Sequence, residues 1–169
     1  MNICVNTTSG RVFWDQQSYK CALGKGGALR AADKREGDGA TPLGIWPIRR
    51  VFYRPDRLSL PVCNFPVQEL KQDDGWCDDP KDAAYNRPVM LPYPASHERL
   101  WREDHVYDLI VELGHNDDPV VPNFGSAVFM HVAKPDFAPT EGCVALRLED
   151  LLDLLARVPA ETCLDIKSG

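Results

Sequence analysis

A series of short apolar runs, each bounded by turn-forming residues, constrains this chain more than any other feature. These runs occupy residues 2–6, 11–14, 45–53, 107–114 and 126–133, and Gly, Pro, Asn or Asp flank each of them. Short apolar or alternating segments with such boundaries are typical of β-strands rather than of amphipathic helices. We therefore expect a chain built mainly from strands.

One helix is expected near the C-terminus. Within residues 148–158, leucine and valine recur at helical spacing, and Glu149 and Asp150 lie where they favour the positive end of the helix dipole. Pro159 ends the pattern, and residues 162–167 read as a closing strand. The predicted fold class is α+β, mostly β, a sandwich or barrel in a single domain over residues 1–169.

Residues 54–106 form a long stretch rich in Pro and Asp with little periodicity. Four aromatic residues within it, Trp76, Tyr85, Tyr93 and Trp101, would give it anchors of its own. Long irregular segments in compact domains are often functional loops or lids. We therefore expect an irregular insertion that contributes to a site.

Composition excludes several function classes. The net charge of −6 and a pI near 5.2 argue against binding nucleic acid or an anionic membrane. No export signal and no membrane-spanning run is recognisable, so we expect a cytoplasmic protein, or a periplasmic one if the sequence is truncated. The sequence predicts no particular oligomeric state.

The six cysteines are too thinly spread for a disulfide scaffold, so reduced thiols are expected. The chain has no CxxC pair and no HExxH spacing, so no metal or other cofactor is predicted.

Cys143, in the segment APTEGCVAL at residues 138–146, is the candidate nucleophile. A reactive cysteine needs a base and a donor pocket for the oxyanion, and His131 and the amides around Gly142 could supply them. The residues alone leave the alternative open that Cys143 is a small buried residue and His131 a satisfied core histidine. A zinc site that uses both residues is a third interpretation.

The segment SAVFMHVAKPDFAPTEGCVAL resembles the catalytic segment of the YkuD-type L,D-transpeptidase family, and GDGATPLGIWPI at residues 37–48 resembles a TPxG segment of the same family. The resemblance implies that Cys143 is the nucleophile, that His131 is the general base, oriented by a backbone carbonyl, and that Thr140 and Gly142 form the turn and oxyanion region. Thr41, Pro42 and Gly44 match the TPxG positions.

The chain departs from the family pattern beside the cysteine. Glu141 stands where the family usually has a second histidine, and Ala145 stands where many members have an arginine. The resemblance implies acyl transfer from peptidoglycan stem peptides or muropeptides, in which Cys143 attacks the bond between the L-centre of diaminopimelate and the terminal D-Ala. The missing export signal favours a cytoplasmic L,D-carboxypeptidase of muropeptide recycling. The alternatives are a cross-linking or D-amino-acid-exchanging L,D-transpeptidase and a non-catalytic peptide-binding domain.

The carboxylates of such a substrate call for a cationic binding residue. The candidates for substrate binding lie mostly in the insertion: Glu141, Arg87, Tyr85, His97, Trp101 and Arg102, with Arg99 beside them.

Overall fold

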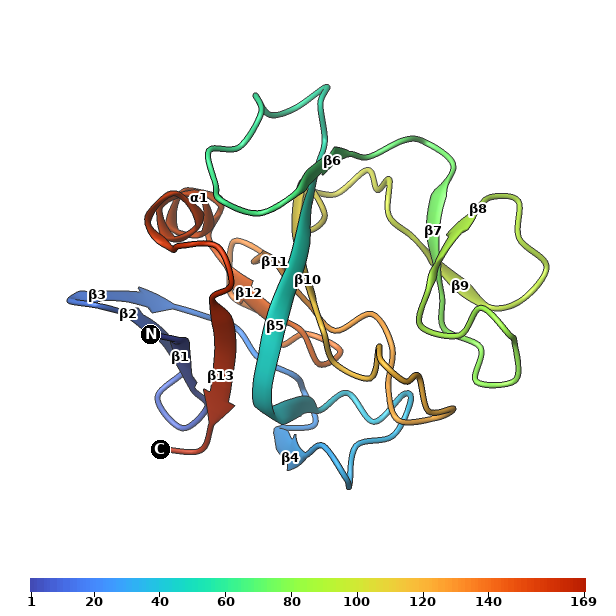
Figure 1. Cartoon of the computed structure of the whole chain (residues 1–169), viewed down its shortest axis with the longest axis horizontal. Helices are drawn as coiled ribbons and strands as arrows, with labels where there is room; N and C mark the ends of the chain where they lie inside the picture. The colour runs from blue at the N-terminus through green and yellow to red at the C-terminus, as the bar shows by residue number, and fades with distance from the viewer.

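The computed structural model describes residues 1–169, which form strands β1–β13 and one helix (Figure 1). The elements are β1 (Ile3–Asn6), β2 (Arg11–Trp14), β3 (Gln17–Lys20), β4 (Ala28–Arg30), β5 (Thr41–Tyr53), β6 (Val67–Glu69), β7 (Asp74–Cys77), β8 (Pro88–Met90), β9 (His97–Arg99), β10 (Leu109–Leu113), β11 (Phe129–Val132), β12 (Val144–Leu146), α1 (Leu148–Arg157) and β13 (Cys163–Lys167). The expected mostly β fold with a C-terminal helix and a following strand is confirmed.

The main sheet is nearly closed into a barrel. Its strands follow the order β12-β11-β10-β5-β13-β1-β2-β3, with β4 and β6 paired to β5. Reciprocal backbone hydrogen bonds between Ala22, just after β3, and Ala145 in β12 join the two ends of this order. Because these bonds pair β12 with the segment that follows β3, β12 has a partner on each side at Ala145, two residues after Cys143.

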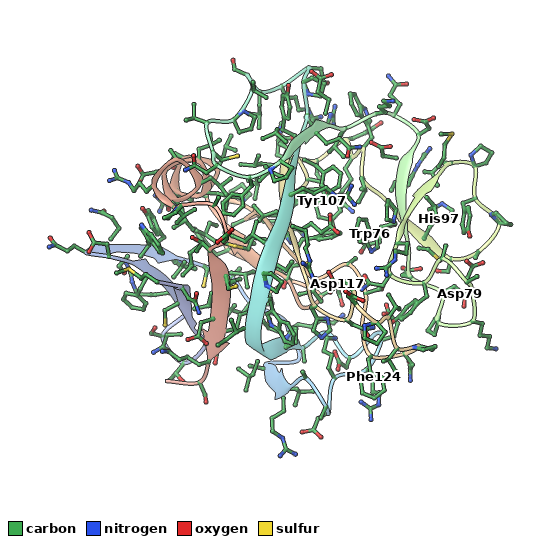
Figure 2. The ribbon with its side chains drawn as sticks, in the orientation of Figure 1. Trp76, Asp79, His97, Tyr107, Asp117 and Phe124 are labelled. Carbon is green, nitrogen blue, oxygen red and sulfur yellow. The ribbon has the colours of Figure 1, made fainter.

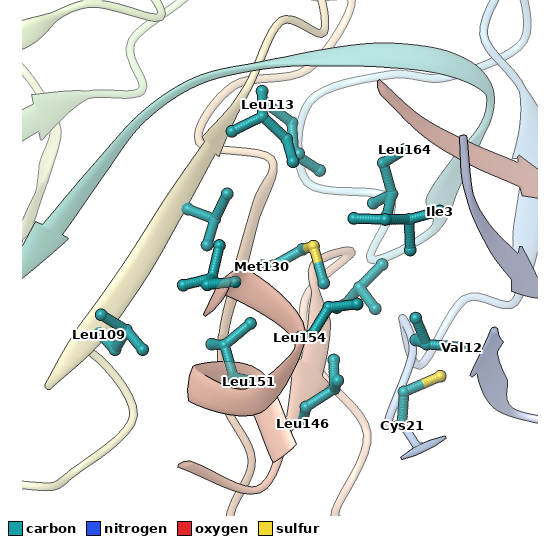
Figure 3. Close-up of a cluster of buried hydrophobic side chains, with 14 of the residues drawn as sticks. Ile3, Val12, Cys21, Leu109, Leu113, Met130, Leu146, Leu151, Leu154 and Leu164 are labelled. Atoms are coloured by element: carbon teal, nitrogen blue, oxygen red, sulfur yellow. The ribbon is translucent and has the colours of Figure 1, made fainter. Parts of the chain in front are cut away.

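The helix α1 seals one side of the barrel, as Figure 1 shows. Leu151, Leu154 and Leu155 are its buried residues, and they pack into a large apolar cluster with Leu146 and Met130 (Figure 3). Truncating a fully buried leucine of this kind typically costs about 2–5 kcal/mol. No helix in the structure is long and apolar enough to cross a membrane.

The insertion is mostly irregular, as expected, but it contains four short strands. Residues 54–106 contain β6, which extends the main sheet, and a separate three-stranded sheet in the order β8-β7-β9. These strands could not be recognised in the sequence, because strands of three or four residues are too short to show a period. The strands β3, β4 and β12 were not predicted from the sequence for the same reason.

The small sheet packs on the barrel through a second apolar cluster. The Trp76 ring of β7 meets the Phe129 ring of β11 edge to face, with centroids 5.1 Å apart. Figure 2 places Trp76 at this junction and His97 farther out on the small sheet. The same cluster includes Ala127 and Cys143. The candidate nucleophile therefore lies where the insertion meets the barrel.

Candidate active site

Two neighbouring parallel strands bring His131 and Cys143 together. In the pairing of β11 with β12, His131 lies opposite Ala145, two residues after Cys143. Side chains two positions apart on a strand point to the same face, so Cys143 lies diagonally across from His131. Both side chains line one cavity.

The Cys143 thiol is buried between two backbone groups. Cys143 is only 8% exposed. The Sγ–H group donates to the carbonyl of Ala127 at 3.3 Å, and Sγ accepts the amide N–H of Phe129 at 3.3 Å. Burial raises the pKa of the thiol to about 12, while the Phe129 amide acts in the opposite direction. The thiol is therefore protonated at neutral pH.

The His131 ring is oriented by the main chain. Its Nδ1 lies 2.9 Å from the carbonyl oxygen of Val132. A carbonyl oxygen only accepts, so Nδ1 carries the proton and Nε2 of the neutral ring keeps its lone pair. Burial lowers the pKa of His131 to about 4. The ring is thus a neutral acceptor, and the Tyr107 ring meets it edge to face at 5.4 Å.

A tight turn delivers Cys143 to the cavity. The Thr140 hydroxyl donates to the Cys143 carbonyl at 2.7 Å and accepts the Gly142 N–H at 3.1 Å. Gly142 has φ +131, and a Cβ atom there would lie 2.8 Å from the Ala40 carbonyl oxygen. Only glycine fits this approach without displacement of the backbone.

The turn leaves one amide free. The Gly142 N–H is occupied by Thr140, whereas the Cys143 N–H has no acceptor in the protein. An unpaired amide beside the nucleophile is suited to receive a developing oxyanion. Of the amides considered from the sequence, the structure leaves that of Cys143 available.

The cavity has a volume of about 360 Å³ and runs from the turn at Cys143 to the small sheet. This size lies at the lower end of the range for small-molecule sites. Its walls come from the segment around Lys34, the insertion, β11 and the loop between His131 and Cys143. A substrate in this cavity would contact the barrel and the insertion at once.

The inner wall of the cavity carries excess negative charge. Of the three lining cations, Lys34 and Arg102 are paired with carboxylates outside the lining, Asp38 and Asp104 respectively, and Lys134 forms no ion pair. The lining carboxylates Glu36, Asp78 and Glu98 have no cationic partner. These three acidic side chains are referred to below as the acidic wall.

The hydrogen bonds of the acidic wall do not neutralise it. Glu36 accepts the hydroxyls of Tyr85 and Ser126, and Glu98 accepts the Tyr107 hydroxyl at 2.9 Å. One carboxylate oxygen of Asp78 is buried without any partner. Burial first, and then the negative charges of Asp78 and Glu36, raise the pKa of Glu98. The wall thus favours a cationic ligand group.

The residues predicted to bind substrate lie in three places: in the cavity, in a neighbouring hollow, and outside both. Arg102 and Glu141 line the cavity, where Glu141 forms an exposed ion pair with Lys25 at 2.8 Å. His97 and Trp101, with Arg99, line a neighbouring hollow that shares Glu98 and Arg102 with the cavity.

Tyr85 and Arg87 do not line the cavity. Tyr85 is buried and its hydroxyl is bonded to Glu36 and Gly125, while Arg87 donates to the Asp117 carbonyl on the outside. The structure therefore gives both residues protein partners in place of the substrate contact predicted for them.

Several site groups have no recognisable signal in the sequence. The backbone groups of Ala127 and Phe129 contact the thiol, and a backbone group carries no residue preference. Lys134, Glu98 and Tyr107 also line the cavity; Lys134 forms no ion pair, and the Tyr107 ring contacts His131 while its hydroxyl donates to Glu98. Glu98 could have been considered, because it stands between the candidates His97 and Arg99.

The remaining interpretations can be compared with this geometry. All six cysteines are free thiols. No group of three His, Cys, Asp or Glu side chains is placed to hold a metal ion, so the zinc interpretation lacks a ligand set. A satisfied core histidine would use both ring nitrogens or face apolar groups, whereas His131 faces the cavity.

Comparison with known proteins agrees with the resemblance of the two sequence segments. No curated protein and no solved structure gives a significant match to the chain. A family model described as the L,D-transpeptidase catalytic domain, YkuD, matches residues 2–166, which is nearly the whole chain. The chain therefore belongs to the YkuD family of L,D-transpeptidase catalytic domains, whose members are cysteine acyltransferases acting on peptidoglycan peptides.

Proposed function

We propose that this chain is a cysteine L,D-carboxypeptidase that removes the terminal D-Ala from peptidoglycan tetrapeptides. The observation that carries the proposal is the shared cavity, in which a buried thiol and a neutral imidazole with a free Nε2 face the same space. The bond cleaved joins the carbonyl of the L-centre of diaminopimelate to the amine of D-Ala. The proposal includes the cytoplasmic location and the role in muropeptide recycling that are expected from the sequence.

The first half of the reaction is acylation. The Cys143 thiol turns from the Ala127 carbonyl toward Nε2 of His131, which takes its proton as the sulfur attacks the substrate carbonyl carbon. The Cys143 N–H receives the oxyanion. The protonated His131 then gives its proton to the departing amine, so that D-Ala leaves and a thioester remains on Cys143.

The second half is hydrolysis. His131 Nε2 takes a proton from a water molecule, whose oxygen attacks the thioester carbonyl. The tripeptide carboxylic acid leaves, and the sulfur recovers the proton from His131. In the alternative transpeptidase, the amine of a second peptide replaces this water. The hollow lined by His97, Arg99 and Trp101 adjoins the cavity and would bind the acceptor peptide of that transpeptidase.

The charges of the cavity support a stem-peptide donor. The acidic wall suits the free ammonium group of diaminopimelate, and Lys134 and Arg102 suit a carboxylate. A cavity of about 360 Å³ has room for the end of one donor peptide, which favours water as the acceptor inside it.

A turnover assay tests this function. The protein is incubated with a disaccharide tetrapeptide, with and without a D-amino acid, and the products are identified by mass spectrometry. We expect loss of D-Ala to give the tripeptide, and no reaction with Cys143→Ala. Cys21→Ala is the matched control, because Cys21 is also buried with a pKa raised by burial to about 12, but lies outside the cavity.

The other outcomes distinguish the alternatives. Exchange of D-Ala or formation of dimers would replace the carboxypeptidase by the transpeptidase. Absence of turnover, together with a Cys143 that resists alkylation in the folded protein, would favour the non-catalytic peptide-binding domain.

A further inference from the structure

The carbonyl that holds the Cys143 thiol belongs to a residue in an unusual backbone conformation. Ala127 has φ +52, in the left-handed region that residues with a Cβ rarely occupy. This conformation costs on the order of 1–2 kcal/mol for a residue other than glycine. It directs the Ala127 carbonyl to within 3.3 Å of Sγ. Some other contact must hold Ala127 in this conformation.

Asn86 of the insertion supplies that contact. Its Oδ1 accepts the Ala127 N–H at 3.0 Å and also the Trp76 indole N–H at 3.0 Å. Its Nδ2 donates to the carbonyls of His115, at 3.1 Å, and Asn116, at 2.7 Å. Asn86 is 4% exposed, and every hydrogen-bonding position of its amide is used.

The neighbouring residue contacts the same segment. The Tyr85 hydroxyl accepts the Gly125 N–H at 3.0 Å. Two consecutive insertion residues, Tyr85 and Asn86, thus bind alternate amides of the segment that leads into β11. Because β7 holds Asn86 through its backbone bond to Cys77, the position of this segment is tied to the small sheet.

We propose that Asn86 is a positioning residue for the nucleophile. It fixes the main chain of Ala127, and the Ala127 carbonyl in turn holds the Cys143 thiol in place. The inference rests on the proposed role of Cys143 but concerns a residue outside the cavity lining.

This arrangement has two consequences for the thiol. A carbonyl acceptor stabilises the protonated thiol and disfavours the thiolate. Loss of Asn86 would free Ala127 to relax, so that Cys143 loses its acceptor and its orientation. The thiolate would then form more readily, while attack on a positioned substrate would become slower. Alkylation and turnover therefore change in opposite directions.

The test measures both quantities in matched variants. The rate of Cys143 alkylation by iodoacetamide at pH 8 is followed by peptide mass spectrometry, which separates Cys143 from the other cysteines. Turnover of the disaccharide tetrapeptide gives kcat and KM. For Asn86→Ala we expect alkylation to rise about tenfold, as for a pKa about one unit lower, and kcat to fall about tenfold with little change in KM.

Two control variants separate positioning from general stability. Trp76→Phe removes the other hydrogen bond to Asn86 Oδ1 and keeps an aromatic ring in the core, so both rates should stay within threefold of the wild type. Asn86→Ala/Ala127→Gly should restore both rates to within threefold, because glycine adopts the left-handed conformation without the cost that alanine pays. A merely structural role for Asn86 would not be rescued by a glycine at position 127.

The proposal is overturned if Trp76→Phe changes both rates as much as Asn86→Ala, or if the double variant folds but shows no rescue. If Asn86→Ala does not fold, Asn86→Asp decides, because it keeps the acceptor for Ala127, although it loses the donors to residues 115 and 116 and adds a negative charge. Its Cys143 alkylation should not exceed that of the wild type, because an added negative charge disfavours the thiolate, and a tenfold rise would refute the proposal. Since alkylation needs no substrate, failure of the proposed function leaves this test intact.

Discussion

The pH dependence of turnover follows from the burial of His131. The base must be neutral to accept the thiol proton, and burial lowers its pKa from 6.5 to about 4. At pH 5, a group with a pKa of about 4 is about 90% neutral, whereas an ordinary imidazole is only about 3% neutral. Turnover at pH 5 should therefore remain about 30-fold higher than an exposed histidine would allow.

The assay is kcat/KM for release of D-Ala between pH 4 and pH 9, because this quantity reports the pKa values of the free enzyme. We expect activity to be lost only as the pH falls through about 4, since protonation of Nε2 removes the base. Circular dichroism at each pH shows whether the protein remains folded.

Glu98 needs a control, because burial and neighbouring carboxylates raise its pKa and it also titrates on the acid side. The acid limb should keep its midpoint in Glu98→Gln if His131 is responsible for it. A midpoint near 6.5 in the wild type would refute the reasoning, because it would show that His131 is solvated or paired with a thiolate in the free enzyme.

Two further predictions concern the turn and the acidic wall. Gly142→Ala should lower the free energy of unfolding by more than about 2 kcal/mol, because φ is +131 and the new Cβ would lie 2.8 Å from the Ala40 carbonyl; urea denaturation measures this. Gly37→Ala, with φ +77 and open space around the Cβ, should cost only about 1 kcal/mol, and equal losses would contradict the steric argument. Glu98→Gln should raise KM for the diaminopimelate tetrapeptide about tenfold with a smaller change in kcat, because it removes a charge facing the ammonium group. The same substitution should leave KM unchanged for a donor whose side-chain amine is acetylated, and an equal rise for both donors would separate Glu98 from ammonium recognition.

The sequence predicts the parts of the fold and site that depend on local pattern. The strands β5 and β10 have apolar runs long enough to recognise, and α1 has a clear helical period. Cys143 and His131 lie within one short segment that carries the family pattern, so their pairing can be inferred from the sequence alone. Such features need no information about distant contacts.

The sequence does not predict the parts that depend on contacts between distant segments. Asn86 lies 41 residues before Ala127, and nothing near either residue indicates their hydrogen bond. The chemistry of Tyr85 and Arg87 suggests substrate contacts, but the fold gives their polar groups protein partners, whereas Lys134 is left facing the cavity. Which polar side chain remains free is decided by the docking of the insertion on the barrel.

The resting state of the site bears on how such a buried thiol can react. Burial alone favours the neutral form of both groups, with a pKa of about 12 for Cys143 and about 4 for His131. A thiolate–imidazolium pair is therefore not the ground state of the site, and proton transfer must accompany attack on a bound carbonyl. In that transition state the new charge moves from sulfur to the oxyanion, beside the free Cys143 N–H. Under the proposed function, we expect the insertion, which contacts Ala127 through Asn86, to keep the Cys143 thiol protonated and only weakly nucleophilic until a substrate fills the cavity.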